Sequence, residues 1–151
     1  MTNMERAEKI VALFKGRLRG LEVRVCSGVT VRLPIQAHRS YWRGDHPDLS
    51  LLQFLAGAFP SEGAYFDIGA NVGVYAAALN AMTKARGRFK AVEFEPIPST
   101  VAILLHTLAL NDVEAQVEQV ALSDQSGELV MSAYDHGLNN FCLGDCLLPN
   151  V

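Results

Sequence analysis

A glycine-rich segment with an acidic residue on either side is the strongest chemical signal in this sequence. The segment runs Asp67-Ile68-Gly69-Ala70-Asn71-Val72-Gly73, and Glu95 follows it after a further helix-length stretch. Glycines permit a tight turn and a close approach of the backbone to a ligand. A carboxylate about 20 residues beyond such a turn is placed to accept hydrogen bonds from ribose hydroxyls. The pattern therefore predicts a ligand that contains a nucleoside.

The spacing of the glycines indicates which nucleoside is favoured. A dinucleotide-binding turn reads Gly-x-Gly-x-x-Gly, but Asn71 and Val74 occupy its second and third glycine positions here. Asp67, directly before the turn, would repel a pyrophosphate and attract a cation. S-adenosylmethionine carries an ammonium and a sulfonium, so this arrangement suits it better than a nicotinamide dinucleotide. A nicotinamide-dependent oxidoreductase is the weaker alternative. Glu93 is expected to point to the same side of the strand as Glu95. Glu95 lies nearer the end of the strand, so it is preferred as the residue that binds the ribose.

Short apolar stretches alternate with helical patterns around these residues. We expect strands over 64–67, 89–94 and 113–122, with helices over 74–85 and 98–110 between them. Such a βαβαβ unit forms a parallel sheet with flanking helices, and ligands bind beyond the carboxyl ends of its strands. The predicted fold class is therefore α/β and Rossmann-like.

Further elements are expected on both sides of this unit. A helix over 3–15, a hairpin over 21–26 and 29–33, and a helix around 51–55 precede it, and a strand over 128–133 follows. We divide the chain into an N-terminal helix and hairpin extension, 1–47, and the N-terminal part of the main domain, 48–151. Asn111 is expected to cap the helix that ends before it.

Four motifs in this order resemble the FkbM family of methyltransferases. They are Tyr65 to Gly73, Glu93-Phe94-Glu95-Pro96, Leu108-Ala109-Leu110-Asn111, and Ala121-Leu122-Ser123-Asp124 with Gly127. The family consists of class I enzymes that use S-adenosylmethionine, typically for O-methylation of hydroxyls on sugars or natural products. The resemblance covers roughly residues 48–141 and implies a class I methyltransferase fold.

The resemblance also implies roles for individual residues. The cofactor motif would consist of Asp67, Gly69, Ala70, Asn71 and Gly73. Glu95 would bind the ribose hydroxyls, and Pro96 would shape the turn that follows. Residues 119–123, with Ala121 and Leu122, would face the adenine. Residues 137–141 resemble, more loosely, a segment near the methyl acceptor. No residue is assigned as the catalytic base.

The sequence departs from the family after the third predicted parallel strand. A family motif of the type Asp-x-x-Lys-x-Asp-x-Glu-Gly, on a later strand, is missing. We therefore expect an incomplete sheet with an uncovered apolar edge and face, which a partner chain or an oligomer would cover. The alternative function is a non-catalytic truncated remnant or a cofactor-binding module of the same fold.

Composition limits the remaining function classes. The 151 residues are 50% hydrophobic and 19% charged, with a net charge of -3, which suits one globular domain and argues against nucleic acid as a partner. No apolar stretch approaches the ~20 residues of a membrane span, and no secretion signal is evident, so a cytoplasmic location is expected. The three cysteines form neither a disulfide framework nor a zinc-binding pattern, and no metal site is expected. The expected partner is a small-molecule or carbohydrate acceptor.

Overall fold

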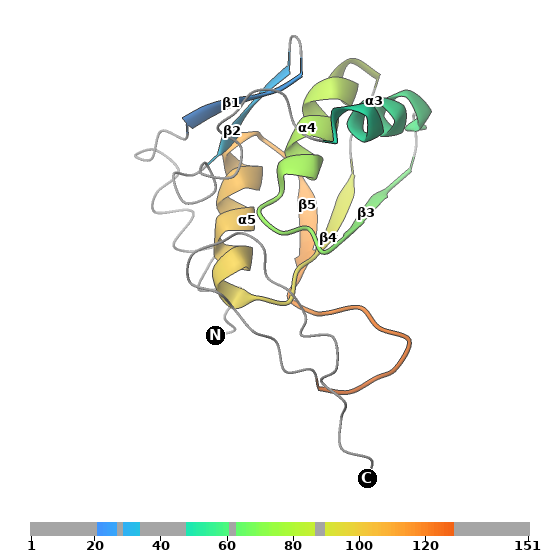
Figure 1. The fold of residues 1–151 in the computed structure, drawn as a ribbon, viewed down its shortest axis with the longest axis vertical. Helices are drawn as coiled ribbons and strands as arrows, with labels where there is room; N and C mark the ends of the chain where they lie inside the picture. The colour runs from blue at the N-terminus through green and yellow to red at the C-terminus, as the bar shows by residue number, and fades with distance from the viewer. Residues whose placement is uncertain (1–20, 27–28, 34–47, 61–62, 87–89, 129–151) are drawn as a thin grey trace.

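A small parallel sheet is the centre of the structure. The computed structural model describes residues 21–26, 29–33, 48–60, 63–86 and 90–128 (Figure 1). Within them, strands β3 (Tyr65–Ile68), β4 (Ala91–Phe94) and β5 (Ala115–Glu118) form a parallel sheet in the order β3-β4-β5. The predicted α/β class, with a parallel sheet and flanking helices, is confirmed. The arrangement is compatible with part of a Rossmann-like fold.

The helices begin and end close to the positions that the sequence predicts. Helix α3 spans Leu49–Ala58 and α4 spans Val74–Thr83, which a short 3-10 helix, η2 (Lys84–Arg86), prolongs. Helix α5 spans Pro98–Leu110 and has its proline in the first turn, where a missing N–H costs nothing. Two predicted strands are too long, because β4 begins at Ala91 and β5 ends at Glu118. Residues 119–128 leave the sheet as an extended loop.

A β-hairpin packs against the helices that cover the sheet. Its strands, β1 (Leu21–Cys26) and β2 (Val29–Leu33), have the predicted bounds and pair antiparallel. Asn111 ends α5 as predicted, with its backbone N–H on the Leu108 carbonyl and its side-chain Nδ2 2.8 Å from the Thr107 carbonyl. The Asn111 amide also exchanges two 2.8 Å hydrogen bonds with the backbone of Arg32 on β2. One side chain therefore holds the hairpin to the helix end.

The two faces of the parallel sheet have different environments. Alternate residues point to the side where α4 and α5 lie (Figure 1), and the buried residues there include Ala91, Glu93 and Val117. On the other face, Phe66 is 60% exposed and Ile68 is 67% exposed. Phe66 stacks on Phe94 with ring centroids 6.3 Å apart. The uncovered apolar face that the sequence predicts is thus present in the described part of the chain.

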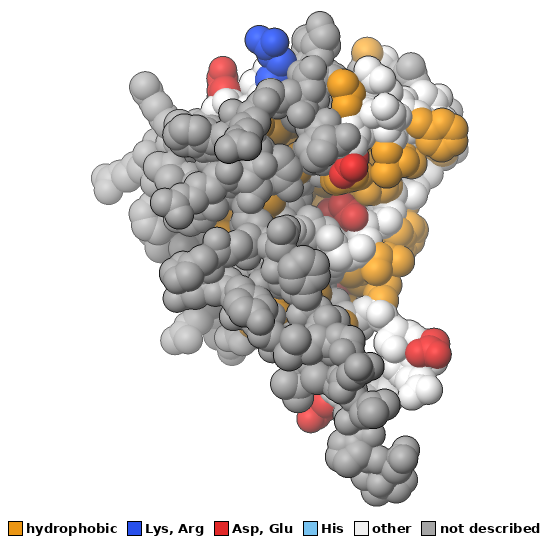
Figure 2. Space-filling model, viewed as in Figure 1, with side chains coloured by type: hydrophobic (Ala, Val, Ile, Leu, Met, Phe, Trp, Pro, Cys, Tyr) orange, Lys and Arg blue, Asp and Glu red, His pale blue; other side chains and the backbone are white. Residues whose placement is uncertain are grey.

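Exposed apolar side chains are visible along one side of the molecule. Figure 2 shows hydrophobic atoms gathered on the side where Figure 1 places α3 and β3. On α3, Leu51 and Phe54 are 47% and 69% exposed, whereas Leu52 is fully buried. Among the residues placed by the structure, no helix has the length and hydropathy needed to cross a membrane. The predicted helix over 3–15 lies outside these residues, as do 129–133 of the last predicted strand.

Candidate functional site

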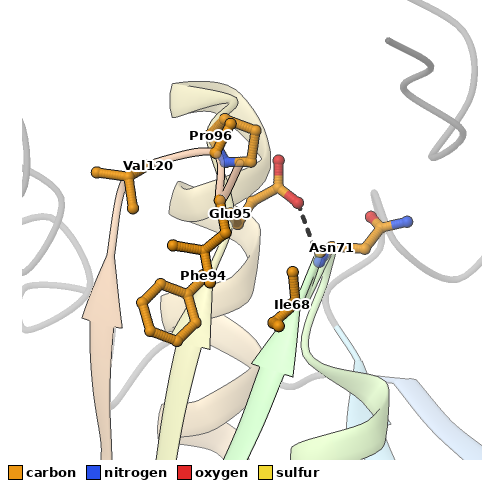
Figure 3. Close-up of a pocket in the computed structure, with 9 residues that line it drawn as sticks. Ile68, Asn71, Phe94, Glu95, Pro96 and Val120 are labelled. Atoms are coloured by element: carbon orange, nitrogen blue, oxygen red, sulfur yellow. Dashed lines mark hydrogen bonds between the residues drawn. The ribbon is translucent and has the colours of Figure 1, made fainter. Parts of the chain in front are cut away.

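A pocket lies at the carboxyl ends of all three parallel strands. It has a volume of about 240 Å³, and Figure 3 shows residues that line it. Its lining brings together six residues that the sequence analysis assigned to the cofactor, namely Gly69, Asn71, Glu95, Pro96, Ala121 and Leu122, together with Ile68, Phe94 and Val120. This is the position where open parallel sheets bind their ligands. Asp67, Ala70 and Gly73, the other three assigned residues, do not line it.

The glycine turn is held by the neighbouring strand. The backbone N–H groups of Gly69 and Ala70 both donate to the carbonyl of Phe94, at 2.9 and 3.0 Å. Gly69 has a φ of 84° and Asn71 a φ of 50°, both in the left-handed region that residues with a side chain rarely adopt. A Cβ on Gly69 would meet no atom within 4 Å, so its backbone conformation, and not a lack of space, calls for glycine.

Glycine is required at position 73 for a reason that does not apply at Gly69, namely lack of space. It is the N-cap residue of α4 with a φ of 80°, and a Cβ there would lie 2.6 Å from Cδ1 of Leu104 on α5. Its N–H donates to the carbonyl of Ala70, which is itself buried. Gly73 therefore lets the two helices approach closely, and its left-handed backbone joins the turn to the start of α4. Gly73 and Ala70 position the pocket without lining it.

Glu95 connects the end of β4 to the glycine turn. Its Oε2 accepts a hydrogen bond from the Asn71 N–H at 3.1 Å, and its Oε1 accepts one from the Ile97 N–H at 3.0 Å (Figure 3). Only 6% of the residue is exposed. Burial raises the pKa of Glu95 above its ordinary value, and the two backbone hydrogen bonds act in the opposite direction. Each oxygen keeps acceptor capacity for a ligand, because a carboxylate accepts about four hydrogen bonds.

The rest of the pocket is apolar and open. Ile68 and Phe94 lie on the near side of the sheet in Figure 3, and Val120 follows β5 near the level of Pro96. Val120 is 45% exposed and Leu122 is 48% exposed. A wider groove of about 1030 Å³ continues from this wall along the first turn of α5 and residues 119–128. A flat apolar group can therefore rest against the strand ends while a polar group reaches Glu95.

Two acidic side chains lie next to each other on the helix-facing side of the sheet, outside the lining of the pocket. Asp67 of β3 and Glu93 of β4 are register partners. Glu93 is fully buried, and among the described residues no donor reaches either of its carboxyl oxygens. Burial and the neighbouring Asp67 raise the pKa of Glu93 to about 8. Burial also raises the pKa of Asp67, and its interactions with the neighbouring side chains of Glu93 and Tyr65 partly offset this rise.

Glu93 is not among the site residues that the sequence predicts. Its position two residues before Glu95 was noted, but only as a less suitable ribose ligand. The available signal was an acidic residue inside an otherwise apolar strand, opposite Asp67 once the parallel register is known. That register depends on tertiary structure, so the pair could not be recognised from spacing alone.

The described residues hold no group of three or more metal-ligating side chains. A comparison of the chain with protein-family models, with curated proteins and with solved structures finds no match in any of the three. The geometry of the pocket therefore carries the functional argument.

Proposed function

We propose that this chain binds S-adenosylmethionine and belongs to a methyltransferase of class I. The reaction we propose is O-methylation of a hydroxyl on a sugar or a natural product. The single observation that carries the proposal is the fixed carboxylate of Glu95, which lines a pocket beside a left-handed glycine turn at the ends of parallel strands. The resemblance to the FkbM motifs supports the same assignment.

The pocket suits a nucleoside better than an anionic dinucleotide. Glu95 can accept hydrogen bonds from two ribose hydroxyls, and the apolar wall of Ile68, Val120 and Leu122 suits a flat base. No lysine or arginine of the described residues lines the pocket. Asp67, on the strand before the turn, provides negative charge for the cationic end of the cofactor. These features favour an adenosyl cation over a pyrophosphate.

The role of the chain in the reaction follows from these contacts. The bound cofactor supplies a methyl group on a positively charged sulfur, which makes that methyl electrophilic. The protein has to hold donor and acceptor in line and exclude water. In this chain, Glu95 and the glycine turn would fix the adenosyl group, and Asp67 would orient the other end.

Calorimetric titration of the full chain with S-adenosylmethionine tests the proposal. We expect saturable binding, and a loss of affinity of about 10- to 100-fold in Glu95→Ala, because bonds to a buried carboxylate are lost. Glu114→Gln changes an exposed acid outside the pocket and should bind as the wild type does. The proposal fails if the folded wild type does not bind, or if the two variants bind equally well.

A cofactor-binding module without catalysis is the second candidate. The observation that favours it is the uncovered sheet face around Phe66 and Ile68, since a complete two-sided α/β sheet would bury these residues. A partner chain that covers this face could supply the acceptor site. Binding of S-adenosylmethionine without methyl transfer to any sugar or polyhydroxylated acceptor would support the module, whereas methyl transfer by the chain alone would exclude it.

A further inference from the structure

The carboxyl groups of Asp67 and Glu93 lie together directly before the glycine turn. The two residues are register partners on neighbouring parallel strands, and both point toward the helices. Glu93 is fully buried, while Asp67, which leads into Gly69, is partly exposed. A buried carboxyl group needs a hydrogen-bond partner or a neutralising charge. Within the described residues, no donor is placed to satisfy Glu93.

A proton shared by the pair resolves this difficulty. If one carboxyl is protonated, its O–H can donate to the other, and the repulsion between two adjacent charges disappears. Burial and Asp67 hold the pKa of Glu93 above its ordinary value, which places the proton there. The arrangement leaves one negative charge on two acidic residues.

Within the part of the chain that the structure describes, the surroundings of the pair supply no positive charge to replace this proton. On β3, the hydroxyl of Tyr65 interacts with Asp67, and on α4 the hydroxyl of Tyr75 donates to Asp48 at 2.7 Å. Glu95, the next acid along the chain, directly follows β4, and β5 places Val117 opposite Glu93. On α5, His106 has a pKa lowered by burial alone. No lysine, arginine or histidine of the described residues shifts the pKa of either carboxyl group.

We propose that Asp67 and Glu93 share one proton in the free protein and release it to solvent when the cationic end of S-adenosylmethionine binds. A cation is attracted more strongly to two negative charges than to one, so binding favours the doubly ionised pair. Glu93 is a positioning residue in this scheme, because it acts through the partly exposed Asp67. The inference rests on the proposed function, since it concerns the same cofactor and the same site.

Calorimetry at about pH 6.5 in two buffers of different ionisation enthalpy measures the released proton. At this pH the cofactor's own ammonium, with a pKa near that of an α-amino group, about 8, is already protonated, so it takes up almost no proton on binding and does not mask the release from the pair. We expect net proton release by the wild type and a rise in affinity of up to about tenfold from pH 6.5 to pH 7.5. In Glu93→Gln, the amide replaces the shared proton, and we expect this release and this rise to disappear.

Glu95 is the other acid that could lose a proton on binding, because its pKa is also raised. Glu93→Gln retains Glu95, so a proton release that persists in this variant overturns the inference. Glu114→Gln serves as the matched control and should keep the full pH dependence. If Glu93→Gln does not fold, the wild-type measurement decides, because the absence of proton release at about pH 6.5 is sufficient to reject the proton-sharing pair.

The two proposals fail in different ways. If the wild type does not bind S-adenosylmethionine at any pH between about 6 and 8, the proposed function fails, and this inference fails with it. If the wild type binds but its affinity and proton balance do not change with pH, only the proton-sharing pair is rejected. Binding with a pH dependence that Glu93→Gln removes supports both.

Discussion

Glu93 lies on β4 and Glu95 directly follows the end of this strand, yet the environments of the two acids are opposite. Glu95 at the strand end accepts hydrogen bonds from two backbone N–H groups, one of which belongs to the glycine turn. Glu93 inside the sheet receives no such bond from the described residues and faces a second acid instead. The carboxyl end of a parallel sheet offers free backbone donors, whereas the interior uses its donors for strand pairing. The same side chain is therefore suited to a ligand at one position and to a proton at the other.

Removal of Glu95 should have the largest effect. Glu95→Ala leaves the N–H groups of Asn71 and Ile97 without their acceptor, which should cost about 2–4 kcal/mol of the free energy of unfolding. Chemical denaturation of the full chain measures this loss. Glu95→Gln keeps one acceptor oxygen and should lose less. Equal stability of Glu95→Ala and the wild type would show that these bonds do not hold the turn.

The turn itself can be tested at Gly73. Gly73→Ala places a Cβ 2.6 Å from Leu104 and forces alanine into a left-handed conformation, so we expect a loss of about 2–3 kcal/mol. Gly57→Ala is the matched control, because Gly57 lies within α3 and a Cβ there would meet nothing within 4 Å. That control should be neutral or stabilising by up to about 1 kcal/mol. If both alanines have the same effect, close helix packing at Gly73 is not required.

Glu93→Gln should stabilise the protein, in contrast to the changes at Glu95 and Gly73. Because the pKa of Glu93 is raised to about 8 in the folded protein, its contribution to stability is fully present below the ordinary glutamate pKa of 4.5. That contribution is lost as the pH rises toward 8, and it changes little at higher pH. We expect Glu93→Gln to remove this slope and to add about 1–3 kcal/mol at pH 8.

Thermal unfolding of the wild type and Glu93→Gln between about pH 4 and pH 9 measures this difference. The two proteins should be similar at the acidic end and should diverge as the pH rises. Parallel curves would mean that Glu93 ionises in the folded protein as easily as in the unfolded chain. Asp67→Asn gives an independent check, because a neutral neighbour should bring the pKa of Glu93 down and flatten the slope in part.

The difference between these two acids also shows what the sequence can predict. The elements around the site follow from local patterns, and the helix ends at Pro98 and Asn111 are where the sequence places them. Glu95 could be identified because its role depends on distance along the chain from the glycine turn. The state of Glu93 depends on strand register and burial, and the function of Gly73 depends on Leu104 from another helix. Such contacts leave no local pattern.

The early end of β5 also depends on contacts between strands, which leave no local pattern in the sequence. Residues 119–122 are as apolar as a strand, which favours the longer prediction. In the structure, the Val120 N–H bonds to the carbonyl of Glu118, only two residues back, and so leaves the ladder. The chain turns away where β4 has also ended at Phe94, since a strand needs a neighbour for its backbone groups. The apolar residues beyond this point line the pocket instead.

The smallest effect is expected on the uncovered face of the same strands. Phe66 is 60% exposed, so Phe66→Gln removes little buried surface and should change the free energy of unfolding by less than about 1 kcal/mol. Val117→Ala, on the helix-facing side of β5, is the matched change and should cost about 1–2 kcal/mol, because this side chain is buried. Chemical denaturation of both variants compares the two faces directly. A loss at Phe66 as large as that at Val117 would mean that this face is covered in solution, and light scattering would then show whether a second copy of the chain covers it.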